Sequence, residues 1–306
     1  MPIAKECMPR SRERPRFAQV ARDLLAMTKP RVVLELLITT VAAMFVAARG
    51  FPDLSVGIST VAGGALCAGA AATFNGLYDR DLDRLMQRTR GRPIPADRLS
   101  VKTGWGWGSL LFVASIGVLA IGVGSAAAWL AVGAFAIYVG VYTLGLKRRS
   151  PQNIVIGGAA GAIPPVIGWV AGAGTLDWSA LVMFTIVFVW TPPHFWALAW
   201  VRRTDYERAG IPMLPVVRDE GSVGVHILAY SVVLVLATLV LTPVNHMGWI
   251  YTAAATILGV LFLERAWVVW RERTAAAAQR LFRYSITYLT VIFVAMVADV
   301  AILGMA

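Results

Sequence analysis

The chain has 306 residues, of which 58% are hydrophobic and only 15% are charged. Soluble domains carry a charge on about a quarter of their residues, so this composition excludes an ordinary water-soluble protein. The net charge of +11 does not indicate nucleic-acid binding, because the basic residues lie between long apolar stretches and not on a soluble surface.

Apolar stretches long enough to cross the hydrocarbon core of a membrane, which takes about 20 residues, recur along the chain. They cover residues 31–48, 56–78, 103–124, 126–144, 154–172, 178–200, 223–244, 247–266 and 284–304. This pattern predicts an all-α membrane protein, a bundle of about nine transmembrane helices with a central cavity that opens near the cytoplasmic side. Residues 1–30 are expected to form a cytoplasmic tail and residues 31–306 a single transmembrane domain.

The basic residues lie almost entirely on one side of these nine spans. All 28 Lys and Arg residues except Arg49 fall in residues 1–31, 79–102, 145–153, 201–222 and 265–283. By the positive-inside rule, this side is cytoplasmic, which places the N-terminus in the cytoplasm and the C-terminus in the periplasm. Residues 1–31 lack the apolar region of a signal peptide, and the composition favours a bacterial inner membrane.

The end of the second span carries polar residues at helical spacing. Asn75, Asp79 and Asp83 stand at positions i, i+4 and i+8, which puts three oxygen-bearing side chains on one helix face. Carboxylates one turn apart repel each other. A cation such as Mg²⁺, which prefers oxygen ligands and often bridges to substrate phosphates, relieves that cost. The spacing alone equally allows a solvated helix end that is held by salt bridges to nearby arginines.

An arginine-rich loop follows this stripe on the predicted cytoplasmic side. Arg88, Arg90 and Arg92 lie within five residues, just before a Pro-Ile-Pro segment. Guanidinium groups can bind two phosphate oxygens at once, so acidic and basic groups together favour a metal-bridged diphosphate. Lys147 lies on the same side, and the sequence leaves open whether it reaches the diphosphate or only follows the positive-inside rule.

A second loop, residues 201–215, has a similar form. It offers Arg202, Asp205 and Arg208, followed by Gly and Pro residues that resemble those of the first loop. The similarity hints at an internal repeat in which the second and sixth spans are equivalent. The two loops are then expected to face each other across a cavity.

The run at residues 75–83 resembles the Asn-x-x-x-Asp-x-x-x-Asp motif of the UbiA-type intramembrane prenyltransferases. Further blocks at residues 28–32, 75–95, 150–169, 193–199 and 205–215 resemble the branch of that family that farnesylates heme b. The resemblance covers about residues 25–300. The acidic motif is typical of the whole family, whereas the last blocks are more specific to the heme-modifying branch.

The resemblance implies transfer of the farnesyl group of farnesyl diphosphate to a vinyl group of heme b. Water adds as a hydroxyl group, and the products are heme O and diphosphate. It also implies Mg²⁺ held by Asn75, Asp79, Asp83 and Asp205, with heme b as a substrate and not a permanent cofactor. The second loop offers one aspartate where many members carry two, so the number of metal ions stays open. Implied partners are the lipid bilayer and either heme A synthase or assembly proteins of heme-copper oxidases.

Aromatic side chains could shield the allylic cation that the loss of diphosphate leaves behind. The candidates are Phe74, Tyr78, Tyr142, Trp190, Phe195 and Trp196. His194 follows two prolines in the sixth span, and it is interpreted either as a group that faces heme or activates water, or as a structural core histidine bonded to a carbonyl that the prolines free. Two other functions remain open, namely prenylation of a quinone precursor or a chlorin, and membrane transport.

Overall fold

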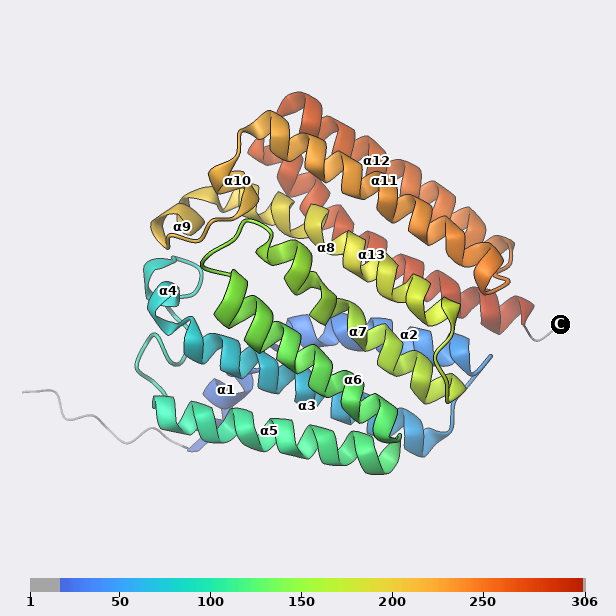
Figure 1. The fold of residues 1–306 in the computed structure, drawn as a ribbon, viewed down its shortest axis with the longest axis horizontal. Helices are drawn as coiled ribbons and strands as arrows, with labels where there is room; N and C mark the ends of the chain where they lie inside the picture. The colour runs from blue at the N-terminus through green and yellow to red at the C-terminus, as the bar shows by residue number, and fades with distance from the viewer. Residues whose placement is uncertain (1–16, 305–306) are drawn as a thin grey trace, which may run out of the picture.

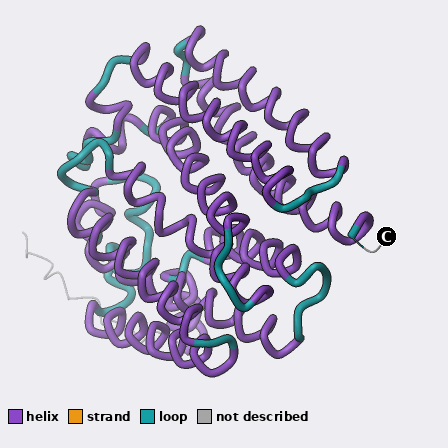
Figure 2. Tube along the Cα trace, turned by 45° about the vertical axis from the view of Figure 1, so that its right-hand side comes forward, coloured by secondary structure: helices purple, strands orange, loops and turns teal. Residues whose placement is uncertain are grey.

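The computed structural model describes residues 17–304, and every regular element in this range is a helix (Figure 2). Nine helices of the described range are long and apolar enough to cross a membrane, which confirms the predicted number of spans. They are α2 (Pro30–Ala47), α3 (Leu54–Tyr78), α5 (Val101–Gly122), α6 (Ser125–Phe135) with its continuation η1 (Ala136–Leu146), α7 (Asn153–Ala173), α8 (Trp178–Val201), α11 (Glu220–Val244), α12 (Trp249–Glu272) and α13 (Ala275–Leu303). The chain is therefore an all-α, multi-pass membrane protein.

The helix ends differ from the predicted spans most clearly near the C-terminus. α12 extends to Glu272 and α13 begins at Ala275, whereas the apolar pattern ended at residue 266 and resumed at residue 284. Hydropathy marks the edge of the hydrocarbon core, but Arg and Glu are good helix formers, so the helices continue past that edge. Thr274 caps the N-terminus of α13, because its side chain accepts a hydrogen bond from the Ala277 N–H at 3.2 Å.

The fourth span changes its helix type half-way. α6 passes directly into the π-helix η1, in which the hydroxyl group of Thr143 donates to the Tyr138 carbonyl at 2.8 Å. Extended π-helix is rare, and π-type turns occur often at functional sites because they re-aim side chains. The end of η1 leads to Lys147.

Small residues allow the central helices to approach closely. A Cβ atom at Gly168 of α7 would lie 2.0 Å from the Thr40 carbonyl oxygen of α2, and one at Gly172 would lie 2.3 Å from the Met44 carbonyl oxygen. No larger side chain fits at these positions without moving a backbone, which is typical of tightly packed membrane helices. α8 packs against α7, α11 and α13, and so it joins the two halves of the bundle.

Short helices gather at one end of the bundle. α4 (Arg80–Leu85), α9 (Arg203–Arg208) and α10 (Leu214–Val217) lie there, and the last turn of α13 lies at the opposite end (Figure 1). α1 (Phe17–Met27) packs against α3. Residues 1–16 of the predicted tail are outside the described residues. The predicted central cavity, the cytoplasmic orientation of the α4 end and the domain boundary at residue 30 stay predictions.

Candidate functional site

The predicted polar stripe lies at the junction of two helices. α3 ends at Tyr78 and α4 begins at Arg80, so Asp79 separates them, with φ −85° and ψ 4°. The Asp79 N–H still donates to the Asn75 carbonyl at 2.9 Å, and the Asp83 N–H donates to the Asp79 carbonyl at 2.7 Å. Helical spacing therefore continues across the junction, and the three stripe residues are all buried.

Asn75 connects polar groups from separate elements. Its Oδ1 atom accepts a hydrogen bond from Lys29 Nζ at 2.7 Å. Its Nδ2 atom donates to Asp79 Oδ2 at 2.7 Å and to Thr143 Oγ1 at 3.2 Å. Lys29 immediately precedes α2 and Thr143 lies in η1, so Asn75 ties α3 to two other spans.

The two carboxylate oxygens of Asp79 differ, because one is hydrogen-bonded and the other is not. Oδ2 pairs with Lys147 Nζ and also accepts from the Asn75 amide. Oδ1 is buried and has no hydrogen-bond partner among the described residues. Leaving a buried acceptor without a partner costs about 1–3 kcal/mol, and more for a charged group. The Asp79 carboxylate can therefore still take a donor or a cation.

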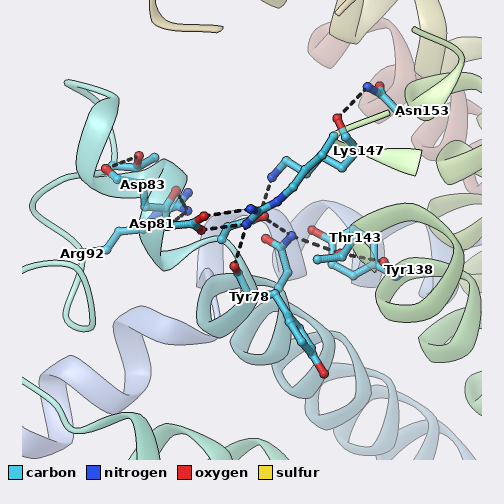
Figure 3. Close-up of polar contacts among 12 residues, drawn as sticks. Tyr78, Asp81, Asp83, Arg92, Tyr138, Thr143, Lys147 and Asn153 are labelled. Carbon is cyan, nitrogen blue, oxygen red and sulfur yellow. Dashed lines mark hydrogen bonds and ion pairs between the residues drawn. The ribbon is translucent and has the colours of Figure 1, made fainter. Parts of the chain in front are cut away.

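Asp83 is held by the arginine-rich loop. Arg92 Nη1 donates to both carboxylate oxygens of Asp83, at 2.9 and 2.7 Å, and the Thr89 hydroxyl donates to the Asp83 carbonyl at 3.0 Å (Figure 3). A cavity of about 20 Å³, room for about one water molecule, is lined by Asp83, Arg92 and Lys29. The loop thus folds back over α4 and brings a guanidinium group to the acidic stripe.

Three cationic side chains converge on this network, namely Lys29, Arg92 and Lys147. Burial lowers the pKa of the Lys29 ammonium group to about 7, and the positive charges of Arg92 and Lys147 act in the same direction. Lys147 and Arg92 are paired with Asp79 and Asp83, whereas Lys29 contacts the neutral Asn75 amide. The network therefore has more basic than acidic side chains, which suits an anionic ligand.

A second ion pair lies at the edge of the site. Arg148 binds both carboxylate oxygens of Asp81, at 2.8 and 2.7 Å, and the Tyr78 carbonyl at 2.9 Å. The hydrogen bond from Arg148 holds the pKa of the Asp81 carboxyl below its usual value. Asp81 is 59% exposed, so this pair joins the α3–α4 junction to the end of η1 at the surface and does not belong to the buried network.

The two loops meet through apolar contacts, whereas the repeat hypothesis expected them to face each other across a cavity, which stays a prediction. Leu82 and Met86 of the first loop share a buried cluster with Tyr206, Ile211 and Met213 of the second. α4 and α9 accordingly lie side by side at one end of the bundle (Figure 1). The loops are therefore adjacent in space although more than a hundred residues separate them in the sequence.

Asp205 lies in the first turn of α9 and is buried. Its side chain makes no ion pair or hydrogen bond with the described residues, and the neighbouring pair of Arg203 and Glu207, at 2.8 Å, is exposed. Apart from Arg92, the predicted arginines of both loops are exposed and form no ion pair within residues 17–304. These four residues are Arg88, Arg90, Arg202 and Arg208. These guanidinium groups remain available to an anion.

The predicted aromatic side chains divide into two groups. Tyr142 and Phe195 pack against the apolar cluster between the loops, and Lys147 Nζ lies 5.8 Å from the centroid of the Tyr142 ring. Tyr78 instead turns away from the acidic stripe toward Trp105 of α5, with ring centroids 5.6 Å apart (Figure 3). Trp196 is 1% exposed and packs against His226 and Tyr230 of α11. Of the candidates, only Tyr142 and Phe195 pack against the cluster between the loops, and Tyr142 also lies near Lys147 of the polar network.

The histidine candidate, His194, lies deeper in the bundle than the polar network. His194 is buried in α8, which continues through Pro192 and Pro193 as one helix. Its Nδ1 atom lies 2.7 Å from Ser285 Oγ of α13. The partner is thus a side-chain hydroxyl, whereas the structural interpretation expected a backbone carbonyl freed by the prolines.

The predicted metal ligands do not form a compact set in this structure. Within residues 17–304, no three Asp, Glu, His or Cys side chains lie close enough to hold a metal ion. The chemistry of the network nevertheless fits a hard cation, because Asn75 and Asp79 offer oxygen donors and one of these is unpartnered. Lys29 and Lys147 supply the positive charge that a cation would bring. The metal set with Asp83 and Asp205 stays a prediction.

Sequence reasoning missed Lys29, Thr143 and Asn153. Asn153 begins α7, is fully buried, and its Nδ2 donates to the Lys147 carbonyl at 3.3 Å (Figure 3). Asn153 thereby holds the backbone that carries Lys147. A lysine directly before the proline that starts the first span was the available signal for Lys29, since a charge so close to the hydrocarbon edge requires a partner.

The family model described as the UbiA prenyltransferase family matches residues 36–295. A protoheme IX farnesyltransferase of Gloeobacter violaceus is 48% identical over 93% of this chain and 94% of its own length. Another, from Chloroflexus aurantiacus, is 44% identical over 96% of this chain, which spans half of that longer relative.

Solved structures show the same fold at low sequence identity. A structure of digeranylgeranylglyceryl phosphate synthase has a TM-score of 0.78 at 14% identity and covers 92% of this chain and 98% of its own. A UbiA homologue from Archaeoglobus fulgidus, bound to DMAPP and Mg²⁺, has a TM-score of 0.62 at 16% identity and covers 89% of this chain and 99% of its own. Because the family model covers most of the sequence and close relatives match along nearly all of it, the chain belongs to the UbiA prenyltransferase family.

Proposed function

We propose that this chain transfers the farnesyl group of farnesyl diphosphate to a vinyl group of heme b. The observation that carries the proposal is the buried network at the α3–α4 junction, in which Asp79 keeps an unpartnered carboxylate oxygen among three cationic side chains. Its chemistry suits a diphosphate with a divalent cation. The heme acceptor is supported by relatives that are 43–48% identical and are named protoheme IX farnesyltransferases.

In this proposal, acidic and basic residues divide the work. Asn75, Asp79 and Asp83, together with Asp205 of the second loop, would hold Mg²⁺, which when bound would supply charge neutralisation for the diphosphate. Lys29 contacts the Asn75 amide oxygen and Lys147 contacts the Asp79 carboxylate, so both ammonium groups lie beside these oxygen ligands. The exposed arginines, Arg88, Arg90, Arg202 and Arg208, bind the outer phosphate oxygens.

The reaction breaks the allylic carbon–oxygen bond, the π bond of the vinyl group and one O–H bond of water, and it forms one carbon–carbon and one carbon–oxygen bond. The allylic carbon–oxygen bond of farnesyl diphosphate breaks, and diphosphate leaves with the electron pair. The farnesyl carbon bonds to the terminal carbon of the vinyl group, and water bonds to the inner carbon as it loses a proton. The allylic cation needs protection from water until the first bond forms, and the rings of Tyr142 and Phe195, which pack against the cluster between the loops, can supply it.

The test uses detergent-purified full-length protein incubated with heme b, farnesyl diphosphate and Mg²⁺. Pigments are separated by chromatography and identified by mass. We expect a product heavier than heme b by one hydroxyfarnesyl unit, which depends on Mg²⁺ and is lost in Asp79→Asn. The matched control is Asp81→Asn, because that carboxylate lies two residues away but points to Arg148 at the surface. Farnesylation of 4-hydroxybenzoate with heme b untouched would refute the heme acceptor while leaving prenyl transfer intact.

We also propose that the α4 end of the bundle faces the cytoplasm of a bacterial inner membrane. The support is the sequence asymmetry, in which Arg49 alone of the basic residues lies on the other side. Cysteine labelling from outside intact cells tests this orientation. A cysteine introduced at residue 246 should react with an impermeant reagent, and one at residue 90 should not. Heme A synthase or assembly proteins of heme-copper oxidases are the proposed recipients of heme O.

A further inference from the structure

Of the three histidines, only His194 is buried in the bundle, and its imidazole ring is held by aromatic side chains. It lies on the side of α8 that meets α13, and three aromatic side chains surround it. The Trp190 ring stacks on the imidazole, with centroids 4.3 Å apart and an interplanar angle of 23°. The Phe282 ring lies at 4.9 Å, tilted by 38°, and Phe195 meets the imidazole edge-on at 4.9 Å. The ring is thus fixed in its plane, and only its edge can meet a ligand.

The hydrogen bonds of Ser285 decide which ring nitrogen of His194 carries the proton. The Ser285 hydroxyl donates its only hydrogen to the Phe282 carbonyl at 2.7 Å. Ser285 Oγ must therefore accept in its 2.7 Å contact with His194 Nδ1, so that Nδ1 is the protonated nitrogen. In a neutral imidazole of this tautomer, the lone pair lies on Nε2.

The Nε2 atom has no hydrogen-bond partner among the described residues. It is also not one of the buried polar atoms that are sealed off without a partner, so it keeps some accessible surface. A bare lone pair in an aromatic environment suits a metal ion carried by a flat apolar ligand better than it suits water. Histidine ligands to metals commonly donate their other N–H to a second group that fixes the ring, as His194 does to Ser285.

We propose that His194 Nε2 coordinates the iron of the acceptor porphyrin and that Ser285 is the positioning residue that holds the imidazole for this contact. The inference rests on the proposed function, because it takes heme b as the acceptor. Coordination would fix the height and tilt of the porphyrin in the bundle, and so bring one vinyl group to the farnesyl carbon. Trp190 contributes to the same arrangement, since its Nε1 donates to the Ser285 carbonyl at 2.8 Å.

His226 provides a matched control. Its Nδ1 donates to the Ser222 carbonyl at 2.7 Å, so it has the same tautomer and a free Nε2 atom. It lies on α11, however, and the Trp196 ring packs between it and α8, with centroids 6.0 Å apart. The two histidines therefore offer equivalent chemistry from opposite sides of α8, and only His194 lies on the side that faces α13.

The experiment titrates heme b into the purified full-length protein without farnesyl diphosphate and follows the absorption spectrum. Wild type and His226→Ala should show the same shifted Soret band and the same affinity. His194→Ala should lose the histidine-type spectrum and bind heme at least tenfold more weakly, and added imidazole should restore the spectrum. Ser285→Ala should weaken binding by about tenfold or more, the usual result of removing a group that orients a metal ligand, and Ser285→Thr should restore it. His194→Gln serves as a second variant in case His194→Ala does not fold.

The outcomes separate this inference from the proposed function. If folded His194→Ala or His194→Gln gives the wild-type heme spectrum and affinity, the inference is overturned, and the proposed function stands if wild type farnesylates heme b. The resonance Raman band of the iron–imidazole bond in ferrous protein gives a further readout, because a purely structural role of Ser285 would not shift it. If wild type ignores heme b and prenylates another acceptor, the proposed function fails and this inference fails with it.

Discussion

Buried carboxylates occur at both ends of the helix bundle, and their partners differ. At the far end, Asp299 of α13 accepts hydrogen bonds from the N–H groups of Gly248 at 2.6 Å and Tyr251 at 2.9 Å. Both carboxylate oxygens are therefore used to cap the start of α12. At the α4 end, Asp79 is equally buried, yet one of its oxygens has no partner and the other faces a lysine.

This difference distinguishes a structural acid from a functional one. A carboxylate whose oxygens are filled by backbone amides belongs to the folded state itself, because backbone donors cannot leave. A carboxylate that is held by a mobile ammonium group and left partly unsatisfied retains capacity for a ligand. Burial alone would have ranked Asp79 and Asp299 together, at 1% and 3% exposed.

The largest expected effect is the loss of catalysis in Asp79→Asn. The amide keeps the volume of the side chain and can still accept a hydrogen bond from Lys147, so the protein should fold. Farnesyl transfer should fall by about 10²–10³-fold, the usual cost of removing one group that stabilises charge in a transition state. Initial rates with saturating substrates measure the effect. A rate within threefold of wild type would show that the unpartnered oxygen has no part in the reaction.

The reciprocal change, Asp299→Ala, should damage stability and spare catalysis. Loss of a helix cap costs about 1–2 kcal/mol, and here two backbone donors lose their acceptor. We expect a lower melting temperature in detergent and an unchanged turnover per folded molecule. Asp299→Asn, which keeps one accepting oxygen, should fall between the two. Reduced turnover at full stability would contradict the structural role assigned to this acid.

The α4 end was easier to predict from sequence than its detailed contacts. Asn75, Asp79 and Asp83 were identified because helical spacing is a local property, and the nine spans were identified because apolar length is one too. The partner of Asn75 on the N-terminal side, Lys29, is 46 residues away in the sequence, and Thr143 is 68 residues away. No local pattern records such contacts.

Some assignments failed for a different reason. α8 is apolar on nearly every side and buried over much of its surface, so its sequence does not show which face meets which neighbour. Trp196 therefore looked equivalent to Phe195, although Trp196 turns to α11 and Phe195 turns to the loops. The interruption of the helix at Asp79 and the π-helix of η1 were also not predicted, because both depend on tertiary packing.

A third prediction concerns Lys29, which fills the place of a cation at Asn75. In Lys29→Met, the Asn75 oxygen is freed and a competing positive charge is removed. Mg²⁺ should then raise the melting temperature more than it does in wild type, equivalent to about 1 kcal/mol of extra stabilisation at the same Mg²⁺ concentration. Melting curves with and without Mg²⁺ measure this difference, and Lys102→Met controls for loss of charge alone. An equal Mg²⁺ effect in both proteins would mean that Lys29 and the cation do not compete.

The smallest expected effect is at the exposed pair of Arg148 and Asp81. Because Arg148 lowers the pKa of the Asp81 carboxyl, the pair stabilises the fold above the ordinary aspartate value of 3.8, and this contribution is lost as the pH falls through the lower, folded-state value. Solvent screening limits the contribution to about 0.5 kcal/mol. Arg148→Gln should therefore melt slightly below wild type at pH 7, and the difference should shrink toward pH 3 and in high salt. A large difference that persists at low pH would show that Arg148 acts mainly through its hydrogen bond to the Tyr78 carbonyl. Arg148 would then stabilise the α3–α4 junction and not the surface ion pair.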